Sequence, residues 1–244
     1  MLYKNTMPKK TPENKETELF NWFDLKEVQD MGPKEEPYPY ENTHIKINSR
    51  ILCVGTTGSG KTSALLHYIH LMPGTFNKII VYYKEREKLY DYLEKKLKGG
   101  IEFHNSLADL PTLAEMRKNA KEADRYLVVL DDYMMELNKY KNVADYFIYG
   151  RKKNITLFCL AQNYYTVPKP LRSQMTYLLL FFMTQQKDIK MVLSDFDTKD
   201  KVLYDIYQDA IEKDGSFLKI TVGKSSPNER FSKGFTNFYT IKKD

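Results

Sequence analysis

The sequence predicts an α/β fold with a mainly parallel central sheet, and two observations carry this prediction. From residue 45 onward, uninterrupted apolar segments alternate with segments of helical pattern, which is typical of a parallel sheet covered by helices on both faces. In addition, residues 55–62 read G-T-T-G-S-G-K-T and fit the pattern G-x-x-x-x-G-K-[ST] at every fixed position. This segment lies between a short apolar strand and a helix, which is the position that a phosphate-binding loop requires.

The individual elements follow from this alternation. Short apolar runs predict strands, and longer segments with spaced apolar residues predict helices. The predicted strands are 50–54, 78–83, 101–103, 126–130, 155–160 and 177–183, and the predicted helices are 63–70, 85–97, 107–121 (despite Pro111), 143–153, 187–197 and 199–213. The segments 216–222 and 235–241 alternate in polarity, and we expect them to pair as a terminal hairpin across residues 223–228.

The first 40 residues differ in character from the rest of the chain. Most of them are polar and weakly patterned, which predicts a partly flexible N-terminal arm over 1–40. Within it, Leu19–Phe23 is an aromatic cluster with the only tryptophan, and we expect it to dock on its own domain or on a neighbouring subunit. The remaining residues, 41–244, are predicted to form a single domain.

Composition narrows the classes of protein that this chain can belong to. The formal net charge of +6 permits nucleic-acid binding without requiring it. No apolar run approaches about 18 residues and the N-terminus is polar, so we expect neither a membrane span nor a secretory leader. Cys53 and Cys159 lie inside apolar strands, and we expect two small buried side chains rather than a disulfide or a metal pair. This expectation suits a reducing compartment.

The phosphate-loop motif points to a nucleoside triphosphate with Mg²⁺. Its glycines let successive backbone N–H groups turn around a phosphate, and the following helix adds partial positive charge at its N-terminus. Lys61 would reach the β- and γ-phosphates, and the hydroxyl of Thr62 would hold Mg²⁺. The candidate binding residues are Gly55, Thr56, Thr57, Gly58, Ser59, Gly60, Lys61 and Thr62.

Acidic residues at strand ends are the candidate metal ligand and base. Asp131 and Asp132 close the strongest apolar strand of the chain. In nucleotide-hydrolysing proteins an acid at this position binds Mg²⁺ and its neighbour polarises the attacking water, so we assign these roles to Asp131 and Asp132 respectively. Glu85, just after the second strand, is an alternative base. Two adjacent acids also simply terminate buried strands in proteins without such a site.

Gln162 and Arg151 flank the next strand. Gln162 ends it, and if this strand neighbours the phosphate-loop strand, its amide would face the γ-phosphate and report hydrolysis. Arg151 precedes the strand, at the end of a helix, where its guanidinium would neutralise charge on a neighbour's γ-phosphate or would serve only as a C-terminal helix cation. Arg86 and Arg172 compete with Arg151 for the first role.

Three segments taken in order resemble a known family. G-T-T-G-S-G-K-T, V-V-L-D-D and G-R-K-K-N-I-T-L-F-C-L-A-Q-N-Y-Y-T-V-P-K-P-L-R are together similar to viral DNA-packaging ATPases of the FtsK/HerA lineage, in particular the poxvirus-type ATPases of large DNA viruses, virophages and polinton-like elements. The similarity covers roughly residues 45–183. It implies a P-loop NTPase three-layer sandwich of the ASCE, RecA-like type. It also implies ATP and Mg²⁺ as cofactors.

The resemblance further implies a function and partners. These are ATP-driven translocation of double-stranded DNA into a preformed capsid by a homomeric ring of five or six copies, a capsid or portal-vertex partner, and a location in the virion or at a cytoplasmic assembly site. Lys61, Thr62, Asp131, Asp132 and Gln162 correspond to the lineage's site residues, and Arg151 to its trans-acting finger. Asp132 stands where the lineage usually has Glu.

Two other functions remain open on the sequence. A small-molecule kinase also combines a phosphate loop with alternating strands, although it generally needs an Arg-rich lid, and only Arg172 lies between the strand ending at Gln162 and the C-terminal segments. An ATP-gated ring adaptor with little turnover is the second alternative. For the motor, the segments Lys169–Arg172 and Tyr164–Tyr165 are candidates to line a channel and contact DNA phosphates.

Overall fold

The computed structural model describes residues 25–26, 37–196, 202–224 and 226–240. The chain divides into two units, 1–36 and 37–244, and the description below concerns the second unit. The aromatic segment Leu19–Phe23, and with it most of the predicted arm 1–40, lies outside the described residues. Its predicted docking therefore stays a prediction.

Strands of the described chain form one sheet in the order β3-β2-β4-β5-β1-β6-β7-β8-β9. The first six in this order are parallel, and β7, β8 and β9 extend the sheet in antiparallel fashion. The strands are β1 (Arg50–Val54), β2 (Lys78–Tyr83), β3 (Ile101–His104), β4 (Tyr126–Asp131), β5 (Ile155–Ala161), β6 (Tyr177–Leu180), β7 (Leu218–Thr221), β8 (Phe231–Lys233) and β9 (Asn237–Phe238).

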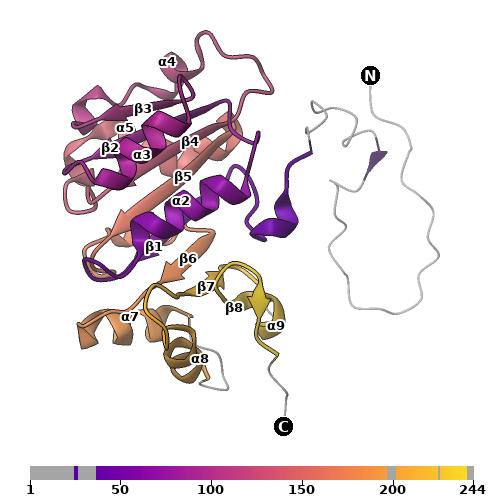
Figure 1. Ribbon diagram of the computed structural model, residues 1–244, viewed down its shortest axis with the longest axis vertical. Coiled ribbons are helices and arrows are strands. Elements are labelled where there is room, and N and C mark those ends of the chain that lie inside the picture. The colour runs from indigo at the N-terminus through magenta and orange to yellow at the C-terminus, as the bar shows by residue number, and fades with distance from the viewer. Residues whose placement is uncertain (1–24, 27–36, 197–201, 225, 241–244) are drawn as a thin grey trace, which may run out of the picture. The chain divides into compact units, whose positions relative to one another are not determined.

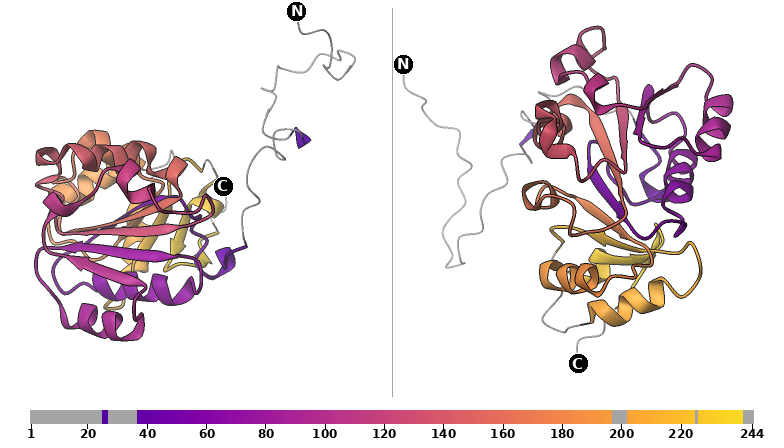
Figure 2. Two further views of the ribbon diagram at one scale, coloured as in Figure 1. Left: turned by 90° about the horizontal axis from the view of Figure 1, so that it is seen from above. Right: turned by 90° about the vertical axis from the view of Figure 1, so that its left-hand side faces the viewer.

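Helices cover both faces of the sheet and make a three-layer sandwich, as the two orthogonal views show (Figures 1 and 2). One face packs against α2 (Lys61–Leu71) and α3 (Lys88–Lys96). The other face packs against α4 (Leu113–Arg117), α5 (Lys141–Tyr149), α6 (Lys169–Arg172), α7 (Gln186–Phe196) and α8 (Leu203–Ala210), and a short helix α9 (Pro227–Arg230) precedes β8. The predicted α/β class with a mainly parallel sheet is confirmed.

The alternation of side chains along each strand divides the core into two layers. On β1, Ile51 and Cys53 face the layer of α2 and α3, whereas Leu52 and Val54 face the opposite layer. Because both faces are covered, the central strands are apolar without interruption. Cys53 and Cys159 are both buried and free, as predicted, and they lie in different layers. Burial raises the pKa of both thiols.

One predicted helix is wrong in its extent. The segment 107–121 contains a 3-10 turn at Leu107–Asp109 and the separate helix α4, with Pro111 between them. Proline cannot donate its backbone nitrogen and disfavours a helical conformation at the residue before it. Thr112 then caps α4, because its hydroxyl accepts the Glu115 N–H at 3.2 Å while the Glu115 carboxylate accepts the Thr112 N–H at 2.8 Å.

The predicted partner within the terminal hairpin is also wrong. Strand β7 pairs with β8, so that Ile220 lies opposite Phe231, and the later segment contributes only β9 at the sheet edge. Phe231 is fully buried, which anchors β8 in this register. The chain turns from β8 towards β9 at Gly234, whose φ of +65° favours glycine.

No helix among the described residues is long and apolar enough to cross a membrane.

Candidate active site

The phosphate loop occupies the turn between β1 and α2, and its glycines are required by close packing and backbone geometry. A Cβ atom on Gly55 would lie 2.5 Å from the Cβ of Phe181 and 2.6 Å from Oγ of Ser59, which leaves no room for a side chain. Gly60, the N-cap of α2, has a φ of +105°, which disfavours any other residue. Gly58 also has a positive φ, of 78°. The loop is thus built for close approach of its backbone to a ligand.

Backbone hydrogen bonds hold the loop between the ends of the two neighbouring strands. The N–H of Gly55 donates to the carbonyl of Ala161 at the end of β5, at 3.2 Å. The N–H of Thr56 donates to the carbonyl of Phe182, just beyond β6, at 3.0 Å. Strand β1 pairs with β5, which meets the condition on which the expected position of Gln162 near the phosphate loop depends.

Lys61 lies at the start of α2 with its ammonium over the loop. Its Nζ donates to the carbonyls of Gly55 and Thr56, each at 2.8 Å. Burial lowers the pKa of Lys61, and the nearby carboxylates Asp131 and Asp132 oppose this shift. The first N–H groups of α2 have no intrahelical acceptor, and such groups bind anions. Ser59 Oγ is buried beside them and has no hydrogen-bond partner among the described residues. This donor set fits the phosphates of a nucleotide.

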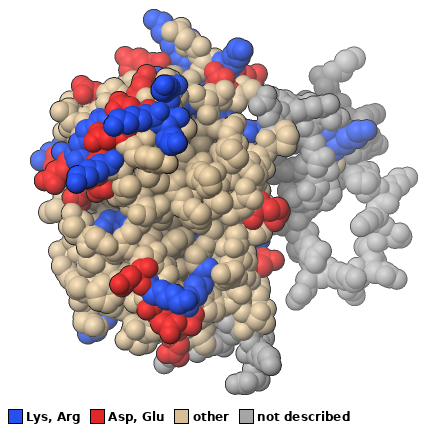
Figure 3. Space-filling model, in the orientation of Figure 1, with Lys and Arg blue, Asp and Glu red and all other residues tan. Residues whose placement is uncertain are grey.

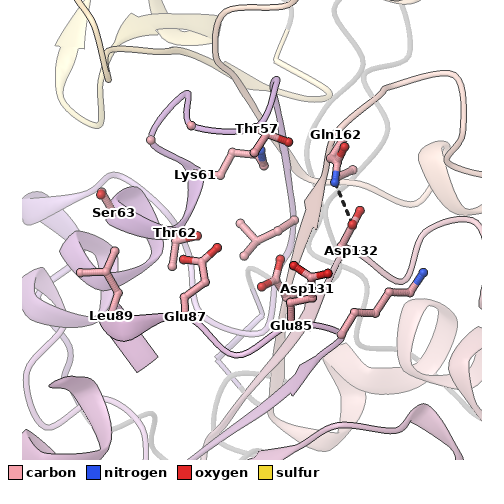
Figure 4. A pocket seen from close by; sticks show the side chains of 15 residues that line it. Thr57, Lys61, Thr62, Ser63, Glu85, Glu87, Leu89, Asp131, Asp132 and Gln162 are labelled. Atoms are coloured by element: carbon pink, nitrogen blue, oxygen red, sulfur yellow. Dashed lines mark hydrogen bonds between the residues drawn. The ribbon is translucent and has the colours of Figure 1, made fainter. Parts of the chain in front are cut away.

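Asp131 ends β4 at the same end of the parallel strands as the phosphate loop. Asp131 and Thr62 line one cavity there (Figure 4). Burial raises the pKa of Asp131 to about 6, while a hydrogen bond from the Tyr90 hydroxyl, 2.6 Å from Oδ2, favours the ionised carboxylate. Mg²⁺ in nucleotide sites takes one or two protein oxygens together with phosphates and water. Thr62 and Asp131 therefore fit the predicted pair of protein groups at such an ion.

Asp132 and Gln162 form a direct pair at the ends of adjacent strands. The Gln162 amide donates to Oδ2 of Asp132 at 2.8 Å, shown as a dashed line in Figure 4. Asp132 has a φ of 61°, a left-handed conformation that turns it out of β4, and its N–H donates to the carbonyl of Leu160 at 3.1 Å. The structure thus brings the predicted base and the predicted sensor together.

One cavity of about 350 Å³ unites these groups. Besides the predicted residues it is lined by Glu85, the alternative base, and by Glu87, the N-cap residue of α3. The sequence reasoning missed Glu87 and Tyr90. Tyr90 is fully buried and has the pattern of an ordinary core aromatic on an amphipathic helix, so no motif could have identified its contact with Asp131. Glu87 carried one usable signal, its place two residues after Glu85 in the first turn of the predicted helix 85–97.

Arg151 is not part of this cavity. It is exposed and lies in the 3-10 turn Gly150–Lys153, just before β5 begins, whereas Gln162 follows the other end of the same strand. A seven-residue strand spans about 20 Å. Arg151 therefore lies at the amino-terminal end of the parallel strands, opposite to the end that carries the phosphate loop of its own molecule.

The competing arginines are engaged within the molecule. Arg86 forms an ion pair with Asp91 at 2.7 Å and another with Glu94, and it lies 4.8 Å from the ring centre of Phe103. Arg172 lies 4.7 Å from the ring centre of Tyr164. Arg151 is exposed as well, and none of the ion pairs among the described residues includes it.

The predicted DNA-contact segment divides into buried and exposed parts. Tyr164 is buried, and its hydroxyl donates to Asp195 at 2.9 Å, while Lys169 and Tyr165 are exposed. Lys187 on α7 lies 4.3 Å from the ring centre of Tyr165. On the face drawn in Figure 3, Lys and Arg are mixed with Asp and Glu, and a broad uncharged zone separates the charged groups. This face carries no continuous basic surface among the described residues.

Comparisons with known proteins relate the chain to viral packaging proteins. Residues 39–207 match the family model described as Poxvirus A32 protein. DNA packaging protein OPG160 of Vaccinia virus (strain Copenhagen) is 24% identical over 157 residues, which cover 61% of this chain and 58% of that protein; the Variola virus protein of the same name shows the same values. The match thus spans a little over half the length of these relatives.

Solved structures with the same fold include a genome packaging NTPase of a virus. The genome packaging NTPase B204 from Sulfolobus turreted icosahedral virus 2, in complex with sulfate, has a TM-score of 0.58 at 12% identity and covers 73% of this chain and 94% of that one. Its complex with ATP-gammaS has a TM-score of 0.56 at 12% identity and covers 75% and 96%. At this identity the likeness shows the fold.

Proposed function

The chain belongs to the poxvirus A32 protein family, and we propose that it is an ATPase that drives double-stranded DNA into a preformed viral capsid. The observation that carries the proposal is the convergence of the phosphate loop, Asp131, Asp132 and Gln162 on one cavity. The names of the related proteins support it, since OPG160 is described as a DNA packaging protein and B204 as a genome packaging NTPase that binds ATP-gammaS.

The phosphate loop and its neighbours bind the nucleotide. The loop N–H groups and the start of α2 surround the phosphates, and the Lys61 ammonium, now held by two loop carbonyls, moves onto the β- and γ-phosphate oxygens. Thr62 and Asp131 would hold Mg²⁺, which would neutralise charge on the phosphates. Tyr90 orients Asp131 for this role through its hydrogen bond.

Asp132 orients and deprotonates the attacking water, and Gln162 links this step to the phosphate. In the described conformation the Gln162 amide donates its hydrogen bond to the Asp132 carboxylate. An amide that turns towards a γ-phosphate releases the carboxylate, so bound nucleotide and the freedom of Asp132 are coupled. Glu85 is the alternative base, because it lines the same cavity.

Arg151 completes the site of an adjacent copy in a homomeric ring of five or six subunits. Its exposure and its distance from its own phosphate loop support a role in trans. The exposed cations Lys169 and Lys187 are the candidate contacts to DNA phosphates, and Lys187 lies over the exposed ring of Tyr165. A capsid or portal-vertex protein at the viral assembly site is the remaining partner.

Turnover measurements with matched variants test this function. We expect ATP hydrolysis that requires Mg²⁺, that duplex DNA stimulates at low salt, and that loses its stimulation as salt rises. Lys61→Ala should abolish nucleotide binding, whereas Asp132→Asn should keep binding and lower turnover by about 10²- to 10⁴-fold. Glu85→Gln is the matched control and should retain turnover.

The contrary results separate the alternatives. Retained turnover in Asp132→Asn together with loss in Glu85→Gln would move the base to Glu85. Absence of DNA stimulation at low salt would count against a motor. Phosphate transfer to a nucleoside monophosphate would indicate a kinase instead.

A further inference from the structure

A second cavity adjoins the phosphate loop. It has a volume of about 350 Å³, and one wall is the loop segment 56–59. The other wall is the turn 211–216 between α8 and β7, and Phe182 lies beside it. The cavity shares Thr57 and Gly58 with the cavity of Asp131, so the two cavities meet at this part of the loop.

Phe182 is held in an exposed position by its neighbours. Its side chain is 52% exposed, whereas Phe181 and Met183 are 0% and 4% exposed. The buried Tyr207 hydroxyl donates to the Phe181 carbonyl and accepts the Met183 N–H, each at 3.0 Å. The Phe182 carbonyl accepts the Thr56 N–H of the loop. These hydrogen bonds fix the backbone on both sides of Phe182. Little backbone entropy is therefore lost when a ligand packs against its exposed ring.

The opposite wall packs against the loop and offers complementary chemistry. A Cβ atom on Gly60 would lie 3.1 Å from Cα of Gly215, so the turn 211–216 touches the loop directly. Ile211 contributes an aliphatic side chain, and the exposed Lys213 and Asp214 contribute polar groups at the rim. An aromatic ring with an aliphatic wall and a polar rim suits a flat heteroaromatic ligand rather than a phosphate.

We propose that this second cavity binds the base of the nucleoside triphosphate, with the ring of Phe182 as its stacking surface. The inference rests on the proposed nucleotide function and adds to it the base-binding subsite. Phosphates lie in the cavity of Lys61 and Asp131, and the base crosses the loop at Thr57 and Gly58. Stacking tolerates any base because each has a π-face. We therefore expect the ring of Phe182 to contribute to affinity for every nucleoside triphosphate and little to the discrimination between bases.

Binding calorimetry with ATP and with inorganic tripolyphosphate, both with Mg²⁺, tests the subsite. Phe182→Ala should weaken ATP binding at least about fivefold and leave tripolyphosphate binding unchanged. Phe182→Trp should retain ATP affinity, because it keeps an aromatic surface. Tyr204→Ala removes an exposed aromatic of α8 that does not line the cavity, and as the matched control it should change neither affinity.

The outcomes distinguish this inference from the function on which it rests. Unchanged ATP binding in Phe182→Ala would overturn the base site and leave the ATPase intact. Equal weakening of ATP and tripolyphosphate would overturn it too, because the substitution would then act through the phosphate loop. Failure of the wild-type protein to bind either ligand would overturn the nucleotide function itself.

Discussion

At the scale of single residues, the site depends on a carboxylate that is held partly out of water. Burial alone would favour the neutral form of Asp131, and its pKa rises to about 6 for this reason. The hydroxyl of Tyr90 donates to that carboxylate at 2.6 Å and stabilises its charge. Tyr90 is therefore a positioning residue, since it acts on a ligand through Asp131 and does not itself line the cavity.

We expect Tyr90→Phe to fold and to weaken the Mg²⁺-dependent part of nucleotide binding. A hydrogen bond to a charged group contributes about 1.5–3 kcal/mol, so the apparent Mg²⁺ affinity measured with ATP should fall roughly tenfold or more, while binding of ATP without Mg²⁺ stays unchanged. Tyr146→Phe is the matched control, because its buried hydroxyl donates at 2.9 Å to a carbonyl, that of Pro111, away from the site. Equal effects of both variants would mean that Tyr90 contributes only to stability.

The sequence was sufficient to place the residues that carry a motif at a strand end, while the roles assigned to them stay predictions. Lys61 and Thr62 follow from the phosphate loop, and Asp131, Asp132 and Gln162 follow from the rule that ligands gather at the carboxyl ends of parallel strands. Their hydrogen bonds could not be predicted. The contact of Gln162 with Asp132 depends on the left-handed turn at Asp132, which an apolar-strand pattern does not encode.

At the scale of elements, the central strands were predictable. The break in one helix and the pairing of the C-terminal strands were not. Strands buried on both faces have an unmistakable composition, so β1, β4 and β5 were located within a residue or two. The break of the helix at Pro111 and the pairing of β7 with β8 depend on local capping and on a long-range partner. Periodicity reports neither.

Strand β7 carries a buried cation that no motif accounts for. Lys219 is fully buried, and its ammonium donates to the carbonyl of Thr43 at 2.9 Å and to that of Phe235. It thereby joins the segment before β1 to the segment after β8. Burial lowers the pKa of Lys219 to about 7. Between this value and the ordinary value of 10.5, the unfolded chain binds more protons than the folded one, so the free energy of unfolding rises with pH.

Lys219→Met should remove this contribution to the pH dependence. From pH 7 to 8.5 the free energy of unfolding of the wild type should rise relative to the variant by roughly 1.5 kcal/mol. Chemical denaturation at several pH values measures the difference, and Lys46→Met, which changes an exposed lysine, is the control. A wild-type and a Lys219→Met protein whose stabilities differ by a constant amount across this range would contradict the assignment.

At the scale of the whole molecule, strand β5 connects two residues to which we assign different roles, Arg151 before its first residue and Gln162 after its last. Strand β5 lies between β4 and β1, so its carboxyl end brings Gln162 between the acids and the phosphate loop. Its amino-terminal end begins close to Arg151, at the opposite end of the parallel strands. In a ring, the same rigid strand would connect an arginine that contacts one neighbour with the γ-phosphate sensor of its own subunit.

This arrangement predicts that Arg151→Ala subunits impair their neighbours. When they are mixed with wild-type subunits at increasing fractions, DNA-stimulated ATP hydrolysis should fall more steeply than the wild-type fraction, because each variant disables an adjacent intact phosphate loop. Lys152→Ala changes the next exposed cation of the same turn and should reduce activity at most in proportion. A proportional loss with Arg151→Ala as well would confine Arg151 to its own subunit, about 20 Å from its own loop, and would leave it without a catalytic role.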